Sequence, residues 1–142
     1  MLKGLDPLLT PALLEALAEM GHGDRIALVD RNYPAYSTGL PVVDLPQVTL
    51  VQALGAILQI FPIDAFPNNP VVYMLTDDGH DGPGLASCRS TWDAVEGRAV
   101  EVAGVLRHGP DGFYAQARDA YIVVQTGETV PYSCYLIPKG VL

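Results

Sequence analysis

The chain has 142 residues, 49% of them hydrophobic, so it is long enough for one domain with a sizeable core and too short for two. Its 16 acidic and 8 basic residues give a net charge of −8, which would repel the phosphates of nucleic acids and anionic lipid surfaces. We predict a single domain over residues 1–142 that binds no nucleic acid and no membrane.

The first predicted helix begins at Thr10 and Pro11, because threonine is a good N-cap residue and proline suits the first helical position. Apolar residues then recur at helical spacing as far as Met20. We expect Gly21 to end the helix in the left-handed conformation, which glycine adopts at the least cost. His22 therefore falls on a turn.

A strand buried on both faces is predicted over residues 26–29, which are all apolar. Asp30 follows at its carboxyl end, where open α/β sheets usually place their ligands. Histidine side chains give and take protons near neutral pH, and a nearby carboxylate can orient them or hold a sugar hydroxyl. His22 and Asp30 are thus candidates for proton-transfer chemistry. The alternative is a solvated turn residue and the N-cap of the next turn.

The remaining predicted elements continue to alternate between helices and strands. In chain order they are a helix over 48–61 that Pro62 terminates, a strand over 71–75, a loop over 76–84, a helix over 85–95, a strand over 99–106, a helix over 113–120, and strands over 121–125 and 135–137. Gly127 is expected to supply a positive φ in a tight turn after residue 125. The alternation predicts an α/β fold, a single layered domain with a central sheet flanked by helices.

Two short motifs do not support a cofactor. Residues 77–82 resemble the start of a calcium-binding loop, but Gly79 stands where a ligand belongs and Cys88 where the bidentate glutamate belongs. The Gly21-x-Gly23 pair follows a helix and opens a strand, the reverse of a dinucleotide-binding motif. We predict no cofactor and no bound metal.

The two cysteines, Cys88 and Cys134, lack the paired spacing of a zinc or redox motif, and we expect structural thiols. The amino terminus lacks the charged and apolar regions of a secretion signal, so the predicted location is cytoplasmic. One alternative does include a metal: His22, Asp24 and Asp30 could form the site of a metal-dependent isomerase or hydrolase.

Two ordered sets of residues lie near the ends of the chain. The first runs from Leu2 to Pro11, continues with Met-Gly-His-Gly-Asp at 20–24, and ends with Asp-x-Asn-Tyr-Pro-Ala-x-Ser at 30–37. The second comprises Phe-Tyr at 113–114, Thr-Gly-Glu at 126–128, Tyr132, and Lys-Gly-Val at 139–141. In this order they resemble the L-fucose mutarotase and D-ribose pyranase family over nearly the whole chain, with a weak match from about residue 63 to 104.

The resemblance implies a carbohydrate isomerase that interconverts the α and β anomers of a monosaccharide without a metal or a redox step. In the family, the histidine equivalent to His22 transfers the proton and the aspartate equivalent to Asp30 binds the sugar. General acid-base catalysis of this kind is typically worth about 10²–10⁴-fold. The amino-terminal residues resemble the L-fucose branch more, so L-fucose or a related pyranose is the expected substrate.

Two departures from the family pattern fall in the implied sugar-binding segment. The family closes with Tyr-x-Asn, of which Tyr132 is retained, while Cys134 replaces the asparagine and lacks its amide donors. The family also carries an arginine or histidine two or three residues before the equivalent of Phe113, where this chain has neither. Arg107 and His108 lie nearby, and the inserted turn at 109–112 could bring either one into the site; Arg107 is the candidate taken as the fourth site residue. The sugar-binding candidates are therefore Asp30, Arg107, Tyr132 and Cys134.

The resemblance also implies a homo-oligomer, a ring that is a decamer in several family members, with the sugar site at subunit contacts. The positive mean hydropathy agrees, since monomers rarely expose large apolar patches. Two other functions remain open on the same fold. One is a non-catalytic monosaccharide-binding or transport-associated protein, which the missing asparagine favours, and the other is a D-ribose pyranase.

Overall fold

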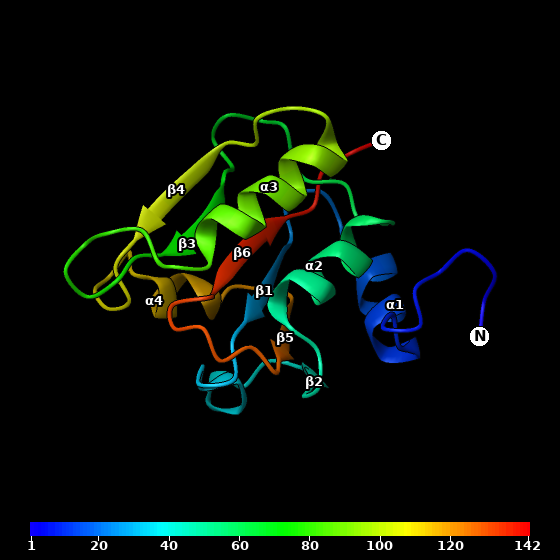
Figure 1. The fold of residues 1–142 in the computed structure, drawn as a ribbon, viewed down its shortest axis with the longest axis horizontal. Helices are drawn as coiled ribbons and strands as arrows, with labels where there is room; N and C mark the ends of the chain where they lie inside the picture. The colour runs from blue at the N-terminus through cyan, green and yellow to red at the C-terminus, as the bar shows by residue number, and fades with distance from the viewer.

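A six-stranded sheet runs through the centre of the computed structural model, which describes all residues from Met1 to Leu142 (Figure 1). The strands are β1 (Arg25–Val29), β2 (Val42–Leu45), β3 (Val71–Met74), β4 (Val102–Val105), β5 (Ile122–Thr126) and β6 (Tyr135–Pro138). Their order in the sheet is β2-β5-β1-β6-β3-β4. Five strands run in one direction, and β6 lies antiparallel between β1 and β3. This antiparallel strand divides the parallel strands into two groups.

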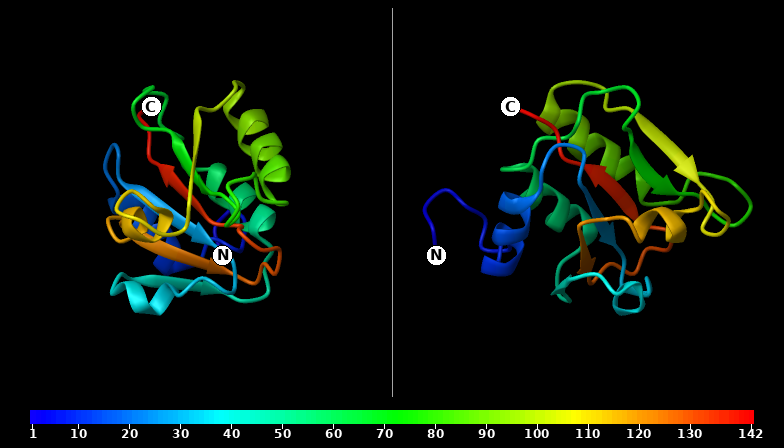
Figure 2. Two further views of the ribbon diagram at one scale, coloured as in Figure 1. Left: turned by 90° about the vertical axis from the view of Figure 1, so that its left-hand side faces the viewer. Right: turned by 180° about the vertical axis from the view of Figure 1, so that it is seen from behind.

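Helices cover both faces of the sheet (Figure 2). The helical segments are α1 (Pro11–Glu19), α2 (Leu50–Leu58), α3 (Leu85–Glu96), α4 (Phe113–Ala117) and a 3₁₀ turn at Ala35–Thr38. Successive residues of β1 face opposite sides, so Ile26 and Leu28 pack with α1, α2 and α3, while Ala27 and Val29 pack with α4 and the 3₁₀ turn. The predicted α/β fold with a sheet flanked by helices is confirmed.

Local sequence signals account for the helix ends. The Thr10 hydroxyl accepts a hydrogen bond from the backbone N–H of Leu13, so Thr10 is the N-cap that the sequence predicts. A capping box formed by Thr49 and Gln52 starts α2, two residues later than predicted. Helix α3 ends at Gly97, which adopts the left-handed conformation. Capping chemistry therefore fixes where these helices begin and end.

Two predictions about glycine conformation are wrong. The chain leaves α1 at Met20 in an extended conformation (φ −60°, ψ 135°), and the left-handed residue is Gly23 (φ 85°) instead of Gly21. Gly127 does not have a positive φ. It is required for space, because a Cβ there would lie 2.1 Å from the carbonyl oxygen of Pro46. A close approach of two backbones, not turn geometry, explains this glycine.

Two elements were not predicted, the edge strand β2 and the 3₁₀ turn before it. β2 has four residues and pairs only with β5, between Pro41 and Pro46. So short a segment carries little periodicity of its own, and its partner decides its conformation. Helix α4 and strand β4 are also shorter than the predicted ranges over 113–120 and 99–106.

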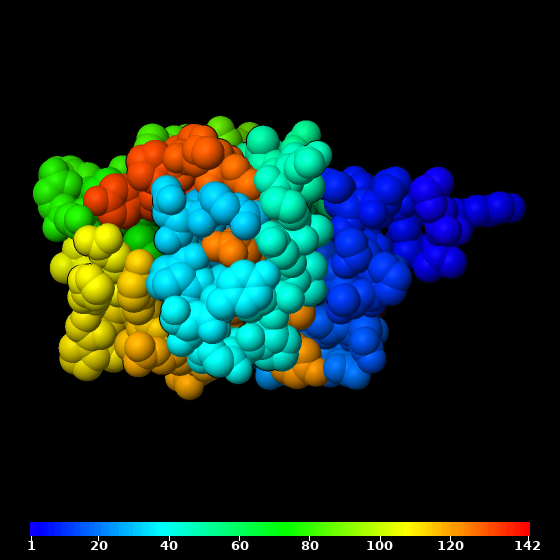
Figure 3. Space-filling view, turned by 90° about the horizontal axis from the view of Figure 1, so that it is seen from below, coloured from blue at the N-terminus to red at the C-terminus, as the bar shows by residue number.

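The amino-terminal residues project from the body of the molecule (Figure 3). Leu2 and Leu5, together with the outer side of α1 and the last residues of the chain, line an apolar groove. Met1, Leu2, Ile60 and Leu142 are exposed around it. No helix combines the length and the apolar character that crossing a bilayer requires.

Candidate functional site

A pocket of about 230 Å³ opens at the carboxyl ends of the parallel strands. Asp30 follows β1, Met74 ends β3, and Arg107 follows β4, while the segment before β6 closes the remaining side. The pocket therefore lies where the antiparallel strand separates the two parallel groups, a usual position for ligands in open α/β sheets. Its lining residues are Asp30, Asn32, Tyr33, Met74, Arg107, Tyr114, Pro131, Tyr132 and Cys134. Its volume suits a small ligand, because pockets for drug-sized molecules are larger.

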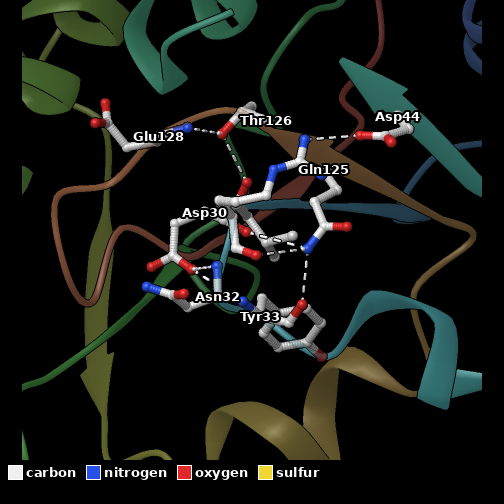
Figure 4. Close-up of polar contacts among 9 residues, drawn as sticks. Asp30, Asn32, Tyr33, Asp44, Gln125, Thr126 and Glu128 are labelled. Atoms are coloured by element: carbon white, nitrogen blue, oxygen red, sulfur yellow. Dashed lines mark hydrogen bonds and ion pairs between the residues drawn. The ribbon is translucent and has the colours of Figure 1, made fainter. Parts of the chain in front are cut away.

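The Asp30 carboxylate is held by backbone N–H groups from two segments of the chain. Oδ1 accepts from Asn32 and Tyr33, each at 3.0 Å (Figure 4). Oδ2 accepts from Ser133 at 3.2 Å. Burial raises the pKa of Asp30 by more than these hydrogen bonds lower it. The residue is thus a fixed, buried acid that lines the pocket.

Two side chains of β5 support the loop that carries Asp30 (Figure 4). The buried amide of Gln125 donates through Nε2 to the carbonyl oxygen of Tyr33 at 2.7 Å and to that of Asp30 at 3.3 Å. The hydroxyl of Thr126 donates to the carbonyl oxygen of Val29 at 2.9 Å. The turn after β1 is therefore fixed by its neighbouring strand, and so is the position of the carboxylate.

Arg107 lines the pocket, as predicted for a residue that replaces the arginine or histidine of the family pattern. One guanidinium nitrogen, Nη2, donates to Asp77 at 2.9 Å, whereas Nε is buried and has no hydrogen-bond partner. A buried N–H without a partner is costly, so its presence in a residue that lines the pocket calls for a functional explanation. The neighbouring His108 does not line the pocket, and its ring instead packs edge-on against Tyr114 at 5.4 Å.

Tyrosine side chains form one wall of the pocket. Tyr33 and Tyr114 meet edge-to-face with their ring centroids 5.3 Å apart. Tyr132 has a φ of 60°, the only positive φ outside glycine, and residues held in such strained conformations cluster at functional sites. Tyr132 was predicted from the sequence, whereas Tyr33 and Tyr114 were not singled out as site residues. The quoted Asn-Tyr-Pro and Phe-Tyr patterns contained them and were the available signal.

Cys134 lies against Asp30. Its thiol is buried, and burial together with the negative charge of Asp30 raises the pKa of Cys134 well above its usual value. The side chain is therefore a protonated thiol and a weak donor. Cys88 is also free and buried, and burial raises its pKa to about 11, so neither cysteine has the character of a nucleophile.

His22 does not lie in this pocket. It precedes β1 at the opposite edge of the sheet, whereas Asp30 follows that strand. Because a strand advances about 3.3 Å per residue, the five residues of β1 separate the two positions by roughly 16 Å. A single copy of the chain therefore does not bring His22 and Asp30 together at one ligand.

The contacts of His22 are with a different acid. Its Nε2 lies 3.1 Å from Oδ2 of Asp64, and its ring packs 5.1 Å from the ring of Phe66. The His22 side chain is 41% exposed, while that of Asp64 is 3% exposed. Asp64 was not predicted from the sequence as a site residue, and it lies in the part of the chain where the family resemblance is weak.

The three residues of the metal alternative are not brought together. Asp24 accepts a hydrogen bond from the backbone N–H of Gly21 at 2.7 Å, close to His22, but Asp30 is at the other end of β1. No group of three histidine, cysteine or acidic side chains is arranged to hold a metal ion. The geometry of the chain gives no support to the metal-dependent alternative.

Residues 3–142 match the model of the RbsD / FucU transport protein family. The chain is 36% identical to the L-fucose mutarotase of Histophilus somni over 141 residues, which covers 99% of this chain and 97% of that protein. It is similar to the crystal structure of a fucose mutarotase in complex with L-fucose from Streptococcus pneumoniae, with a TM-score of 0.88, 31% identity and 99% of each chain covered. The structure of Bacillus subtilis RbsD complexed with D-ribose has a TM-score of 0.75 at 20% identity, covers 100% of this chain and 99% of its own, and supports the fold alone.

Proposed function

This chain belongs to the RbsD/FucU transport protein family, and we therefore propose that it is a mutarotase that interconverts the α and β anomers of L-fucose or a pyranose of similar shape. The observation that carries the proposal is the Asp30 pocket. It places a rigidly held carboxylate, an unpartnered arginine N–H and tyrosine side chains around a volume suited to one monosaccharide. Full-length similarity to an L-fucose mutarotase supports the sugar class.

Each polar group of the pocket has a role in holding a sugar. The Asp30 carboxylate accepts hydrogen bonds from sugar hydroxyls, because an ionised acid is an acceptor only. Arg107 donates from its unpartnered Nε to a hydroxyl or ring oxygen. The Tyr132 hydroxyl serves as donor or acceptor. Hydrogen bonds of this kind to charged groups are each worth about 1.5–3 kcal/mol.

The reaction needs proton transfer at two oxygen atoms and no electron transfer. A proton leaves the anomeric hydroxyl, the ring oxygen takes up a proton, and the bond between the anomeric carbon and the ring oxygen breaks to give the open-chain aldehyde. Rotation about the adjacent carbon–carbon bond and reclosure give the other anomer. In the proposal His22 accepts and returns the proton, as general acid-base catalysis requires.

His22 reaches the sugar from a neighbouring copy of the chain. The separation of His22 and Asp30 to opposite edges of the sheet supports this, because one copy cannot place both at one ligand. The apolar groove beside α1 includes Lys139 and Gly140 at the His22 edge, and it offers a surface that a second copy would cover. We therefore propose that the chain assembles as a homo-oligomer, and we expect a ring such as a decamer.

A non-catalytic sugar-binding protein is the second candidate, and Cys134 is the observation that favours it. The thiol occupies the place of the family asparagine and has no amide group to offer a sugar. Restoring that residue by Cys134→Asn distinguishes the candidates. Faster anomer exchange in the variant than in the wild type would show that the thiol reduces catalysis, whereas tighter binding without exchange would support a binding protein.

The proposal is tested by NMR saturation transfer between the anomeric protons of L-fucose, D-ribose, D-galactose and D-glucose. Accelerated exchange of one sugar that His22→Ala abolishes would support it and identify the substrate. His80→Ala is the matched control, since His80 lies on an exposed loop, and it should leave exchange unchanged. Saturable binding without acceleration of any sugar would favour the second candidate. Absence of both would contradict the proposed function.

A subunit-mixing experiment tests the origin of His22. His22→Ala and Asp30→Ala are each expected to be inactive, and the two proteins are then dissociated, mixed in equal amounts and reassembled. If each site takes its histidine from one copy and its aspartate from another, about a quarter of the sites regain both residues. No recovery of exchange after mixing would mean that one copy supplies both.

A further inference from the structure

We propose that Asp77 is a positioning residue for Arg107: its carboxylate pairs with Nη2 and so holds the guanidinium in the wall of the pocket, where the Nε N–H donates to a bound sugar. The inference rests on the proposed function, because that function gives the pocket its sugar. Asp77 itself does not line the pocket, and it lies on the loop after β3, 30 positions from Arg107 in the sequence.

The pairing of β3 with β4 brings Asp77 and Arg107 together. The two strands are parallel, so the loop after β3 lies beside the end of β4 (Figure 1). The backbone N–H of Leu75 donates to the carbonyl oxygen of Val105 at 2.8 Å, and each of the two charged residues comes two positions after this contact. Nη2 of Arg107 then lies 2.9 Å from Oδ2 of Asp77. The ion pair therefore joins the two loops at this edge of the sheet.

The backbone of Arg107 is fixed by the turn that leads into α4. Its carbonyl oxygen accepts a hydrogen bond from the backbone N–H of Tyr114 at 3.1 Å. Gly112 closes the turn, and a Cβ there would clash with the carbonyl oxygen of His108. The remaining freedom of Arg107 is therefore in its long side chain, which is the part that Asp77 contacts.

The loop after β3 carries three acids, and each has a different partner. Asp78 pairs with His80 at 3.2 Å, and Asp81 accepts a hydrogen bond from the hydroxyl of Tyr73 at 2.7 Å. Of the three, Asp77 is the acid whose partner lines the pocket. The loop that resembles the start of a calcium site thus contributes one of its acids to a pocket arginine.

A guanidinium that is held at one nitrogen is oriented at the others, because the group is planar and its N–H donors form a rigid fork. Nε of Arg107 is buried and has no partner in the protein, while 36% of the whole side chain is exposed. Without Asp77 the end of the side chain would turn freely into solvent, and a sugar would have to order it on binding. Preorganisation of this kind strengthens binding.

The ion pair should affect binding and leave stability unchanged. The side chains of Arg107 and Asp77 are 36% and 58% exposed, and exposed ion pairs contribute little to the stability of a fold. Asp77→Asn should therefore melt within about 2 °C of the wild type. Asp78→Asn is the matched control, since it removes the neighbouring exposed acid, which pairs with His80 instead.

The first test needs no sugar and uses the protein with ¹⁵N-labelled arginine. An ion pair slows the rotation of a guanidinium, so NMR at low temperature should show separate Nη signals for Arg107, assigned by their loss in Arg107→Met. Asp77→Asn should merge these signals, and Asp78→Asn should leave them separate. Merged signals in the wild type would overturn the inference.

The second test measures the affinity for the preferred one of the four sugars by calorimetry. Asp77→Asn should weaken binding by about 3-fold or more, because the cost of ordering one long side chain moves to the binding step. The maximal exchange rate at saturating sugar should stay within about 2-fold of the wild type, since Arg107 binds the sugar and His22 transfers the proton in the proposed function. Asp78→Asn should match the wild type in both.

A double-mutant cycle tests whether Asp77 acts through Arg107. In the Arg107→Met background, Asp77→Asn should change the affinity by less than about 1.5-fold, because the side chain that it positions is absent. An equal weakening by Asp77→Asn in both backgrounds would contradict the positioning role.

The outcomes separate the inference from the function on which it rests. A wild-type protein that binds none of the four sugars would contradict the proposed function, and the role of Asp77 toward a sugar with it. A wild type that binds a sugar and an Asp77→Asn variant that binds it equally well would contradict the positioning role alone. A variant that melts more than about 5 °C below the wild type would also contradict it, because the ion pair would then act on the fold.

Discussion

The substitution Gln125→Met should lower stability by releasing the loop that carries Asp30. The Gln125 amide is buried and donates to the carbonyl oxygen of Tyr33 at 2.7 Å and to those of Asp30 and Arg31 at 3.3 Å. Methionine has a similar unbranched shape but no N–H donor, so the variant removes these bonds without a large cavity. Only the bond to Tyr33 is short, and it dominates the expected loss.

The expected loss of stability in Gln125→Met can be calculated from the carbonyl oxygen of Tyr33, which loses its buried hydrogen-bond donor. Removing the donor from a buried hydrogen bond typically costs about 1–3 kcal/mol. For a chain of this length a loss of 1 kcal/mol lowers the melting temperature by about 4 °C, so the expected decrease is about 4–12 °C. Asp30 and Tyr33 both line the pocket, so sugar affinity should fall as well.

Thermal unfolding followed by circular dichroism provides the assay. All samples need the same protein concentration, because the melting temperature of an oligomer depends on it. Gln47→Met is the control, since Gln47 is exposed and substitutions at such positions usually change stability by less than about 0.5 kcal/mol. If both variants have the same melting temperature as the wild type, the Gln125 amide does not stabilise the loop, and the prediction is refuted.

Three further predictions concern the site and the backbone. Arg107→Met should weaken binding of the preferred sugar by about 10-fold or more in calorimetry, because it removes the unpartnered Nε donor, and unchanged affinity would exclude Arg107 from the site. The hydrogen bonds on the Asp64 carboxylate outweigh the effect of burial, so its pKa is lower in the folded protein than in the unfolded chain. Ionised Asp64 therefore stabilises the fold at pH values above its ordinary pKa of about 4, and this stabilisation is lost as the pH falls through the lowered pKa of the folded state. The difference in unfolding free energy between the wild type and Asp64→Asn should therefore be smaller at about pH 3 than at about pH 7 in urea titrations, and a constant difference would contradict it. Gly127→Ala should destabilise by about 1–3 kcal/mol, because its Cβ would lie 2.1 Å from the Pro46 carbonyl oxygen, whereas Gly55→Ala, inside α2 with open space around it, should stabilise.

Local signals predicted much of the fold because they depend on residues near one another in the chain. Thr10 caps α1 as expected, and the apolar residues of β1 are buried on both faces with Asp30 at the carboxyl end. Local signals failed where the cause lay elsewhere. The sequence predicts that Gly127 is needed for a turn, but the structure shows that the backbone of Pro46, in a distant segment, excludes a side chain at this position.

The candidate site shows the same division. The family pattern identified Asp30, Tyr132 and Cys134, and the pocket brings these three together. It does so because β6 lies beside β1, so the residues before β6 meet the residue after β1. No spacing along the chain predicts that contact, because the order of strands in a sheet is decided by pairing between segments far apart in sequence.

The sequence by itself determined the α-helices, the central strand, the family and four of the nine residues that line the Asp30 pocket, since capping, periodicity and motifs are local. The tertiary structure decided how the chemistry is distributed. It placed His22 at the opposite edge of the sheet from Asp30 and gave it a different acid, Asp64, 42 residues away. The physical reason is that a strand of fixed rise separates its two ends, while the turns at each end acquire partners only when the sheet assembles.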